Sequence, residues 1–329
     1  MRLTTLLLAI APFAAACVGE PAGHRKPGSG SAAGSGSGSD QSAGPCARVD
    51  GDVAIRAAAD MATLPKTGCY DIYGKLTLQG AGVTSLAGLN EINSVDELDL
   101  DHTGLTAIDT KRPLGIYGKL TVSGNAKLTN LKQLSFETAS TGIEIDSNAV
   151  LASLDPLGLA DPALAEVDGD IAITANPVLT SVPLGHLTRV TGGLVVSGNA
   201  KLTSLDLGKL TTTGPIDISN NAALASLGTM SALYRVTGNV TVDGNAALTN
   251  LAAFTTSLKF IDLALTITNN NALTDLGALK HLQLVGGIEI TNNANLVTCR
   301  ALEIDRCVQH PTASQITNNK NASCTTACN

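Results

Sequence analysis

Aromatic side chains are nearly absent from this chain of 329 residues, which has no Trp and only 2% aromatic residues in total. Hydrophobic residues nevertheless make up 44% of the sequence, so its core must be filled by Leu, Ile, Val and Ala. Aliphatic side chains of similar size suit thin layers that repeat, because a bulky ring would not fit every copy of the same slot. The composition therefore favours a repetitive architecture over an ordinary globular core.

Positive charge and catalytic motifs are also scarce. The 21 Lys and Arg residues are outnumbered by 28 Asp and Glu residues, and no segment gathers basic residues into a cluster. Nucleic-acid binding needs a basic face that displaces phosphate counterions, so nucleic acid is excluded as a partner. The five His residues form no His-Glu-x-x-His motif, and the chain has neither a Gly-x-Ser-x-Gly elbow nor a phosphate-binding loop. We therefore expect a protein that is not an enzyme and uses no cofactor or metal.

The chain has one long hydrophobic run, from Leu3 to Phe13, and it is followed by Ala14-Ala15-Ala16-Cys17. A membrane-spanning helix needs about 20 apolar residues, so this shorter run predicts a secretory signal peptide over residues 1–16. A Cys directly after small residues resembles the bacterial lipoprotein cleavage box, in which that Cys is acylated and becomes the new N-terminus. The resemblance implies lipidation of Cys17 and a membrane partner through that acyl anchor. The same residues also satisfy the Ala-x-Ala rule for ordinary cleavage, which would leave a secreted protein.

Residues 17–45 consist mainly of Gly, Ser, Ala and Pro. A segment with so few apolar side chains cannot offset the entropy of ordering, so we expect a flexible tether that holds a folded domain off a membrane. Val18 follows Cys17, and this pair resembles the signal for the outer membrane in Gram-negative lipoproteins. We therefore expect a lipid-anchored protein of the cell envelope, at the outer membrane or cell surface, with secretion as the alternative.

A repeat occupies residues 46–299, and GGLVVSGNAKLTSL, from Gly192 to Leu205, is its clearest copy. Eleven copies follow the template Gly-x-Φ-x-Φ-x-x-Asn-x-x-Leu-x-x-Φ, where Φ is aliphatic. The first two Φ positions alternate with polar or small residues, which indicates a short strand with its aliphatic side chains facing inward. The aliphatic pairs are Val53/Ile55, Leu76/Leu78, Leu98/Leu100, Leu120/Val122, Ile143/Ile145, Ile171/Ile173, Leu194/Val196, Ile216/Ile218, Val240/Val242, Leu265/Ile267 and Ile288/Ile290.

An anchor residue lies three positions after the second aliphatic residue of each pair. The eleven anchors run from position 58 to position 293, so the mean spacing between neighbouring anchors is 23.5 residues. This spacing falls in the range of leucine-rich repeats. The first three anchors are Ala58, Ala81 and Thr103. A buried Asn at a bend can satisfy unpaired backbone groups and bond to the Asn of the next coil, so we expect a structural Asn column. It contains Asn125, Asn148, Asn176, Asn199, Asn221, Asn245, Asn270 and Asn293.

Two segments, VTGNVTVDGNAALTNL (Val236–Leu251) and GGIEITNNANLVTC (Gly286–Cys299), resemble the receptor L domain. That domain is the leucine-rich solenoid of insulin- and EGF-type receptor ectodomains and of fungal cell-wall proteins with a GPI anchor. The resemblance covers roughly residues 49–299 and includes the Cys that follows the last turn, here Cys299. Together the repeat and the resemblance predict a mainly β fold: a right-handed parallel β-solenoid of about eleven turns with disulfide-capped ends.

The cysteines bear on those ends, where a solenoid exposes its core. The chain has seven Cys, and setting Cys17 aside leaves six, enough for three disulfides in an oxidising compartment. Cys46 and Cys69 bracket the first turn and could pin it. The remaining four crowd the C-terminus, predict a Cys-rich cap over residues 300–329, and allow three pairings: Cys299, Cys307, Cys324 and Cys328. Zinc at the Cys324-x-x-x-Cys328 pair is an alternative that an oxidising compartment disfavours.

A candidate ligand-binding face is formed by Glu97, Asp99 and Asp101, which alternate on one strand and so face outward about 7 Å apart. Glu144 and Asp146 repeat the pattern two turns on. Three interpretations remain open: a solvated face, a site for an ion or cationic ligand, or the carboxylates of a polysaccharide-cutting β-solenoid enzyme.

Two further features bear on binding. The step from Asn148 to Asn176 is the longest, and its acidic insertion could form a surface loop or a binding loop. Tyr73 and Tyr117 occupy equivalent positions and could serve as sugar platforms or cover the edge of the core.

The sequence therefore predicts a non-catalytic surface lipoprotein of the cell envelope. It would recognise an unknown protein or glycan, or mediate adhesion, through the outer face of the solenoid. One alternative is a structural protein that organises the envelope, and another is a polysaccharide-active β-helix enzyme.

Overall fold

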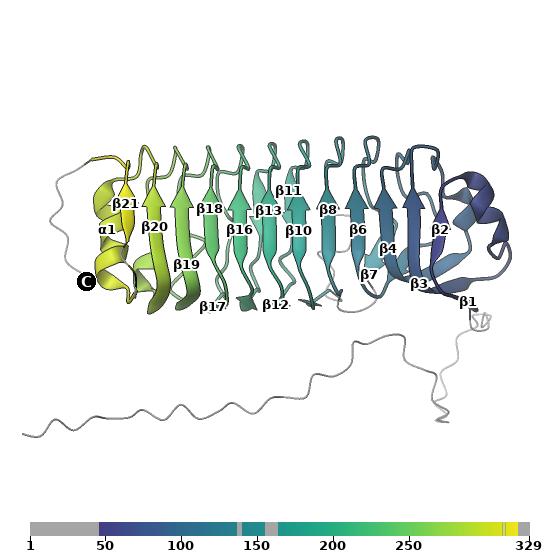
Figure 1. The fold of residues 1–329 in the computed structure, drawn as a ribbon, viewed down its shortest axis with the longest axis horizontal. Coiled ribbons are helices and arrows are strands. Elements are labelled where there is room, and N and C mark those ends of the chain that lie inside the picture. The colour runs from purple at the N-terminus through teal and green to yellow at the C-terminus, as the bar shows by residue number, and fades with distance from the viewer. Residues whose placement is uncertain (1–45, 137–139, 155–163, 311, 313, 322–329) are drawn as a thin grey trace, which may run out of the picture. The chain divides into compact units, whose positions relative to one another are not determined.

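The computed structural model describes residues 46–136, 140–154, 164–310, 312 and 314–321, all within one compact unit, Gly38–Asn329. The chain in this unit winds into coils that stack so that equivalent strands lie side by side, as Figure 1 shows from β2 to β21. The expected signal peptide over residues 1–16, the tether over 17–45 and the lipidation site Cys17 lie outside the described residues.

One sheet, here called the long sheet, contains one strand from each coil, or the second half of a longer strand. Every pairing in it is parallel. Ile171, Leu194 and Ile216 pair in register from coil to coil, and so do Ile173, Val196 and Ile218. The predicted parallel β-solenoid of about eleven turns is thereby confirmed. The strands of the long sheet are, in order, β2 (Val53–Ile55), β3 (Tyr70–Gln79), β4 (Ile92–Asp101), β6 (Leu120–Ser123), β8 (Ile143–Asp146), β10 (Ile171–Thr174), β13 (Leu194–Ser197), β16 (Ile216–Ser219), β18 (Val240–Asp243), β19 (Phe260–Thr268), β20 (Leu284–Thr291) and β21 (Gln315–Thr317).

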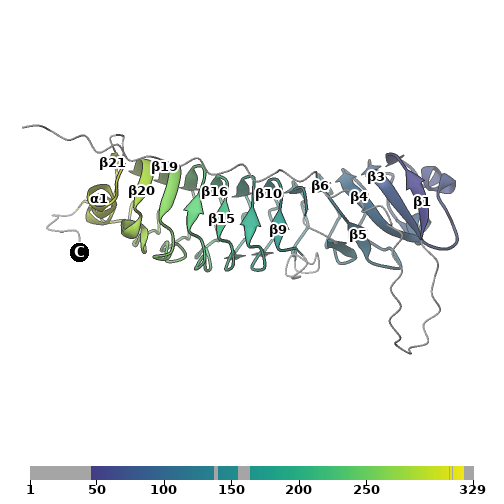
Figure 2. The ribbon, with the colours of Figure 1, turned by 90° about the horizontal axis from the view of Figure 1, so that it is seen from below.

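A second sheet precedes the long sheet in each coil, and Figure 2 shows its strands β5, β9 and β15 along another side of the stack. β3, β4, β19 and β20 are long enough to take part in both sheets. The other strands of the second sheet are β1 (Ala47–Asp50), β5 (Leu114–Ile116), β7 (Leu134–Phe136), β9 (Glu166–Val167), β12 (Arg189–Val190), β15 (Thr212–Thr213) and β17 (Arg235–Val236). A third pairing joins β11 (Ser181–Pro183) to β14 (Ser204–Asp206).

Aliphatic side chains fill the interior, as the composition predicts. In a typical coil Leu194 and Val196 from the long sheet are buried against Leu202 and Leu205 from the turn that follows. Because each coil supplies the same slots with side chains of similar size, adjacent coils bury a continuous core that no single coil could bury alone.

The Asn side chains form a continuous hydrogen-bonded column through this interior. Oδ1 of Asn199 accepts from the backbone N of Asn176 at 3.0 Å and from its Nδ2 at 3.3 Å. Nδ2 of Asn199 donates to the carbonyls of Ile173 at 2.8 Å and Ser197 at 3.2 Å. The eight Asn residues of the column are 0% exposed. Every amide of the column thus bonds to a backbone carbonyl of the preceding coil, and seven of the eight also bond to a carbonyl of their own turn, as expected of a structural column.

The column differs from the predicted set of anchors at both ends. Ala58 and Ala81 are exposed and lie outside it, because a methyl side chain has no polar atom to contribute. The column begins at Thr103, which donates through its backbone N and Oγ1 to Oδ1 of Asn125. It ends at Asn319, whose Oδ1 accepts from Asn293. Residues 315–319 therefore add one more strand and anchor inside residues 300–329, which were predicted only as a cap.

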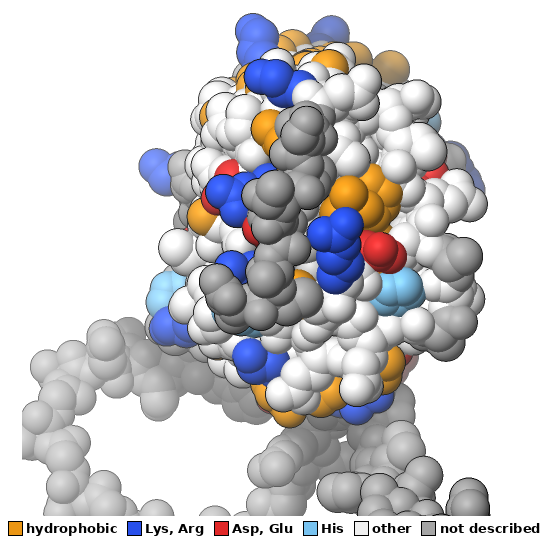
Figure 3. Space-filling view, turned by 90° about the vertical axis from the view of Figure 1, so that its left-hand side faces the viewer, with side chains coloured by type: hydrophobic (Ala, Val, Ile, Leu, Met, Phe, Trp, Pro, Cys, Tyr) orange, Lys and Arg blue, Asp and Glu red, His pale blue; other side chains and the backbone are white. Residues whose placement is uncertain are grey.

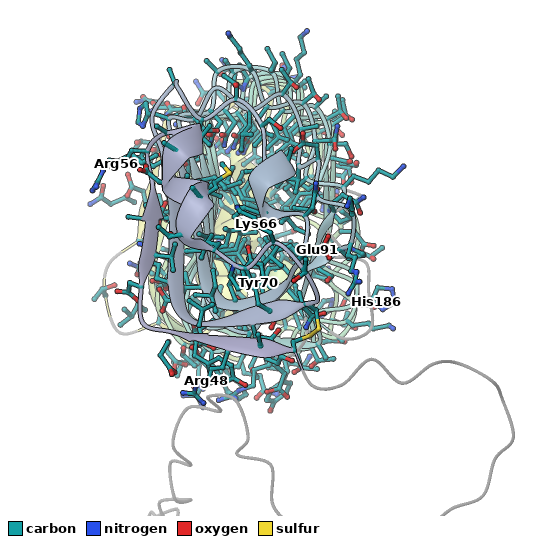
Figure 4. All side chains as sticks on the ribbon, turned by 90° about the vertical axis from the view of Figure 1, so that its right-hand side faces the viewer. Arg48, Arg56, Lys66, Tyr70, Glu91 and His186 are labelled. Carbon is teal, nitrogen blue, oxygen red and sulfur yellow. A yellow bond between two sulfur atoms is a disulfide. The ribbon has the colours of Figure 1, made fainter. Side chains whose placement is uncertain are left out.

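The N-terminal end of the stack is closed by the helix η1 (Ala58–Thr63) and by a disulfide between Cys46 and Cys69, visible in Figure 4. Tyr70 lies behind them, fully buried. Burial, followed by the charge of Glu91, raises the pKa of its hydroxyl to about 12. A short helix, η2 (Ala87–Leu89), lies in the next coil and buries Leu89.

The C-terminal end carries the helices η4 (Leu279–His281) and α1 (Thr298–Cys307), and α1 turns Cys299, Ala301 and Ile304 toward the core. Cys299 and Cys307 are both disulfide-bonded; Cys324 and Cys328 lie outside the described residues. Figure 3 looks onto this end, where Lys and Arg side chains are spread over the surface that it shows. Among the described residues, no helix is long and apolar enough to cross a membrane.

Candidate functional site

The outer face of the long sheet is built from two rows of side chains that point away from the core. The middle row contains the residue between the two inward aliphatic residues of each strand, and the edge row contains the residue after them. The middle row is Ala54, Thr77, Asp99, Thr121, Glu144, Ala172, Val195, Asp217, Thr241, Thr266, Glu289 and Gln315. The edge row is Gln79, Asp101, Ser123, Asp146, Thr174, Ser197, Ser219, Asp243, Thr268, Thr291 and Thr317.

Asp99 is held by an ion pair across two coils. Glu97, Asp99 and Asp101 all lie on the outward side of β4, as the alternation predicts. Oδ2 of Asp99 lies 2.7 Å from Nζ of Lys75, and the Asp99 side chain is only 17% exposed. The hydrogen bond to Asp99 raises the pKa of Lys75, against the opposing effect of burial. The negative charge of Asp99 is therefore balanced by Lys75 within the sheet.

Asp101 is held by a network of its own. Nδ1 of His102 lies 2.5 Å from Oδ1 of Asp101, and Nε2 of Gln79 donates to Oδ2 at 2.8 Å. These two hydrogen bonds, the one from His102 first, hold the pKa of Asp101 below its ordinary value. His102 has a φ of 49°, and its ring lies over Gly124 in the next coil, where a Cβ would come within 2.5 Å of Nε2.

Glu144 and Asp146 on β8 form a separate group. Nζ of Lys119 donates to Oε2 of Glu144 at 2.9 Å, and Oγ1 of Thr174 donates to Asp146. β6 separates this group from the carboxylates of β4 and presents Thr121 and Ser123 instead. The acidic residues therefore form two clusters bonded across coils, and not a continuous carboxylate ladder.

A hollow of about 260 Å³ opens beside the Lys119–Glu144 pair, where Gly142 contributes no side chain. Asp170 lines its far side and accepts from the backbone N of Gly193 at 2.7 Å. Within the part of the chain that the structure describes, no group of three or more His, Cys, Asp or Glu side chains could hold a metal ion.

The C-terminal half of the outer face is lined by hydroxyl groups, which the sequence analysis missed. Oγ of Ser219 donates to Oγ of Ser197 at 2.8 Å, and Asp243 accepts from Thr268 at 2.5 Å and from Asn269 at 2.7 Å. The signal was present in the sequence, because the later repeats place Ser or Thr at the outward positions of most strands.

Asp217 stands apart from the other carboxylates on this face. It occupies the middle row in register with Val195 on one side and Thr241 on the other. Its Oδ1 is buried and has no hydrogen-bond partner among the described residues. A buried acceptor without a partner is unfavourable, so a donor from a bound molecule would stabilise this position once the side chain turns its Oδ1 outward.

The acidic insertion and the candidate tyrosines are bonded within the protein. Glu166 and Asp168 both lie 3.7 Å from the guanidinium of Arg189, and most of the remaining insertion, residues 155–163, lies outside the described residues. The guanidinium of Arg48 lies 3.9 Å above the ring of Tyr73. Tyr73 and Tyr117 are both half-buried, so they are poorly placed as platforms for a sugar.

A comparison of the chain with protein-family models and with curated proteins found no match.

Proposed function

We propose that this protein is a non-catalytic recognition or adhesion protein of the cell envelope, and that it binds its partner through the outer face of the long sheet. In the part of the chain that the structure describes, aliphatic side chains and the Asn column line the interior. The outward rows are available on every coil, at a spacing of about 4.8 Å. The partner is a protein or a glycan.

The observation that carries this proposal is the network that fixes the outward side chains before any partner arrives. Lys75 holds Asp99, Lys119 holds Glu144, and Ser219 bonds to Ser197 across adjacent coils. Side chains that are already ordered lose less conformational entropy on binding, so a pre-organised polar face supports specific recognition. Asp217 adds an acceptor that lacks a donor within the described residues.

We further propose that the chain is a lipoprotein with a receptor L-domain-like solenoid. Cleavage after residue 16, acylation of Cys17 and the Gly/Ser-rich tether would present the solenoid at the outer membrane or cell surface. Two features support the likeness to the L domain: the spacing of the repeats, and Cys299, which follows the last predicted turn and is the second residue of α1.

The binding face is tested by reversing its charge. The double variant Asp99→Lys with Asp101→Lys removes one ion pair and two hydrogen bonds and places two cations on the face. We expect it to lose most of the component that the wild-type protein captures from envelope extract, while its circular-dichroism spectrum stays unchanged. Weakened capture is expected for two reasons. The new lysines would repel any cationic groups of the partner that faced the two carboxylates, and the loss of these carboxylates removes contacts that fix how the partner docks.

The matched control is Glu166→Lys on β9 of the second sheet with Asp168→Lys just after that strand, which makes the same charge change and breaks the contacts to Arg189. It should capture as much as the wild-type protein. Equal capture by both double variants would remove the long sheet from the proposal. If the wild-type protein captures no specific component, the structural envelope-organising role becomes the better account.

A further inference from the structure

An exposed apolar patch lies on the second sheet near its C-terminal end, on a different face from the long sheet. Arg235 on β17, Phe260 on β19 and Leu284 on β20 pair in register, and all three point outward. Tyr234, directly before β17, is 50% exposed, and Leu284 is 41% exposed. We call Tyr234, Phe260 and Leu284 the aromatic patch.

The two rings of the aromatic patch have a defined geometry. The centroids of Tyr234 and Phe260 are 5.4 Å apart, and their planes meet at 71°, edge to face. In such a pair, each ring keeps at least one face clear of its partner, whichever ring offers its edge. An aromatic face carries partial negative charge, so it attracts C–H groups that carry partial positive charge.

A bidentate ion pair forms the polar rim of the patch. Nε of Arg235 lies 2.9 Å from Oδ1 of Asp262, and Nη2 lies 2.8 Å from Oδ2. The Arg235 side chain is half exposed, so its remaining donors and the carboxylate lone pairs can reach a ligand. The planar pair fixes donors and acceptors next to the rings.

The size of the patch indicates its occupant. It spans three adjacent coils, roughly 10 Å at the spacing of paired strands. A stable protein interface buries about 800 Å² on each partner, which three side chains cannot supply. A pyranose ring with equatorial substituents suits such a patch, because its flat C–H face can stack on an aromatic ring while its hydroxyls reach the rim.

We propose that the aromatic patch and the Arg235–Asp262 pair form a binding subsite for a neutral β-linked glycan, with one pyranose ring stacked on Tyr234. The site is independent of the binding face proposed on the long sheet. This subsite cannot be predicted from the sequence, because Tyr234 and Phe260 belong to different repeats and meet only through the stacking of coils.

The test titrates the whole chain with two neutral probes, the tetramers of β-1,4-linked glucose and β-1,4-linked N-acetylglucosamine, by isothermal calorimetry. We expect saturable binding of at least one tetramer with a Kd on the order of 1 mM, typical of a single stacked sugar. Tyr234→Ala should weaken binding about tenfold, since it removes the stacking platform. Arg235→Lys should weaken it about threefold, because a lysine cannot make the bidentate pair.

The matched control is Val150→Ala, which trims another exposed apolar side chain on a distant coil and should leave the Kd unchanged. Shifts of the Leu284 methyl signals on addition of sugar would place the ligand on the patch. The proposal is overturned if neither tetramer binds at about 10 mM, ten times the expected Kd, or if Tyr234→Ala binds like the wild type. It is equally overturned if the protein is a dimer that Tyr234→Ala converts to a monomer, because the patch would then contact a second copy.

Discussion

At the scale of the residue, the buried amide of Asn199 shows why a polar column can run through an aliphatic core. Its side chain contacts Asn176, Asn221 and two backbone carbonyls, Ile173 and Ser197, and the amide itself is fully buried. Buried polar groups are tolerated where each finds a partner. The sequence predicts the column well because the Asn recurs at one position, three residues after the second aliphatic residue of each strand.

We expect Asn199→Ala to lower the free energy of unfolding by about 3 kcal/mol, because it leaves the carbonyl of Ile173 and the backbone N of Asn176 buried and unpaired. Chemical denaturation followed by circular dichroism measures this change. The control is Lys201→Ala, an exposed position in the same turn, which should change stability by less than about 0.5 kcal/mol. Equal changes in the free energy of unfolding for the two variants would show that the buried amide does not stabilise the stack.

His310 on the C-terminal coil has contacts from which we expect a dependence on pH. Its Nε2 lies 2.9 Å from the carbonyl O of Asp305, and its Nδ1 lies 2.7 Å from the carbonyl O of Thr312. Both contacts need an N–H, and only the imidazolium has two. These backbone hydrogen bonds, the one to Asp305 first, raise the pKa of His310 above its ordinary value.

A group with a raised folded-state pKa stabilises the fold fully below its unfolded pKa, near 6.5 for His, and loses that effect as pH rises through the folded value. We therefore expect amide exchange in α1 to become faster, relative to the central coils, as pH rises from about 6 to about 8. His310→Gln should abolish this pH dependence. A His310 titration by NMR with a pKa below 6.5 would contradict the assignment.

At the scale of the element, glycines at the bend before most long-sheet strands let neighbouring coils approach. A Cβ on Gly192 would lie 2.6 Å from the carbonyl O of Gly169, and one on Gly214 would lie 2.3 Å from that of Gly192. These contacts are to backbone, which cannot move aside without separating the coils. At this bend the backbones of neighbouring coils are therefore in direct contact. The recurrence of Gly two residues before the strand predicts such a close approach.

Gly192→Ala should lower the free energy of unfolding by about 2–3 kcal/mol through this overpacking. The adjacent Gly193→Ala is a matched control, because its Cβ would meet its nearest atoms at 3.6 Å, an ordinary contact. Thermal unfolding of the two variants separates the effects. Identical melting temperatures would show that the coils adjust at no cost.

Some elements could not be predicted from the sequence. The second sheet contains strands as short as Thr212–Thr213, which carry no alternation long enough to detect. β21 was missed because it has one aliphatic residue, Ile316, where the other repeats have two. The outer-face bonds were missed for another reason: Lys75 and Asp99 are 24 residues apart, and only the register of the stack brings them together.

At the scale of the whole molecule, the inward side chains determine stability and the outward side chains are free to determine binding. Inward side chains stabilise the contacts between coils, and stability in such a stack is a sum of coil and interface terms. Outward side chains on the long sheet contribute less, because ion pairs at the surface add little to the free energy of unfolding. The outer face can therefore vary with the partner while the fold persists.

The most direct test measures capture of the same envelope component by two variants at a temperature at which both are folded. Asp217→Lys changes the outer face at a carboxylate whose Oδ1 has no bond to lose, and Asn199→Ala changes the interior. The account predicts that Asp217→Lys loses capture and keeps its melting temperature, while Asn199→Ala melts earlier and captures normally. Normal capture by Asp217→Lys, or lost capture by folded Asn199→Ala, would contradict it.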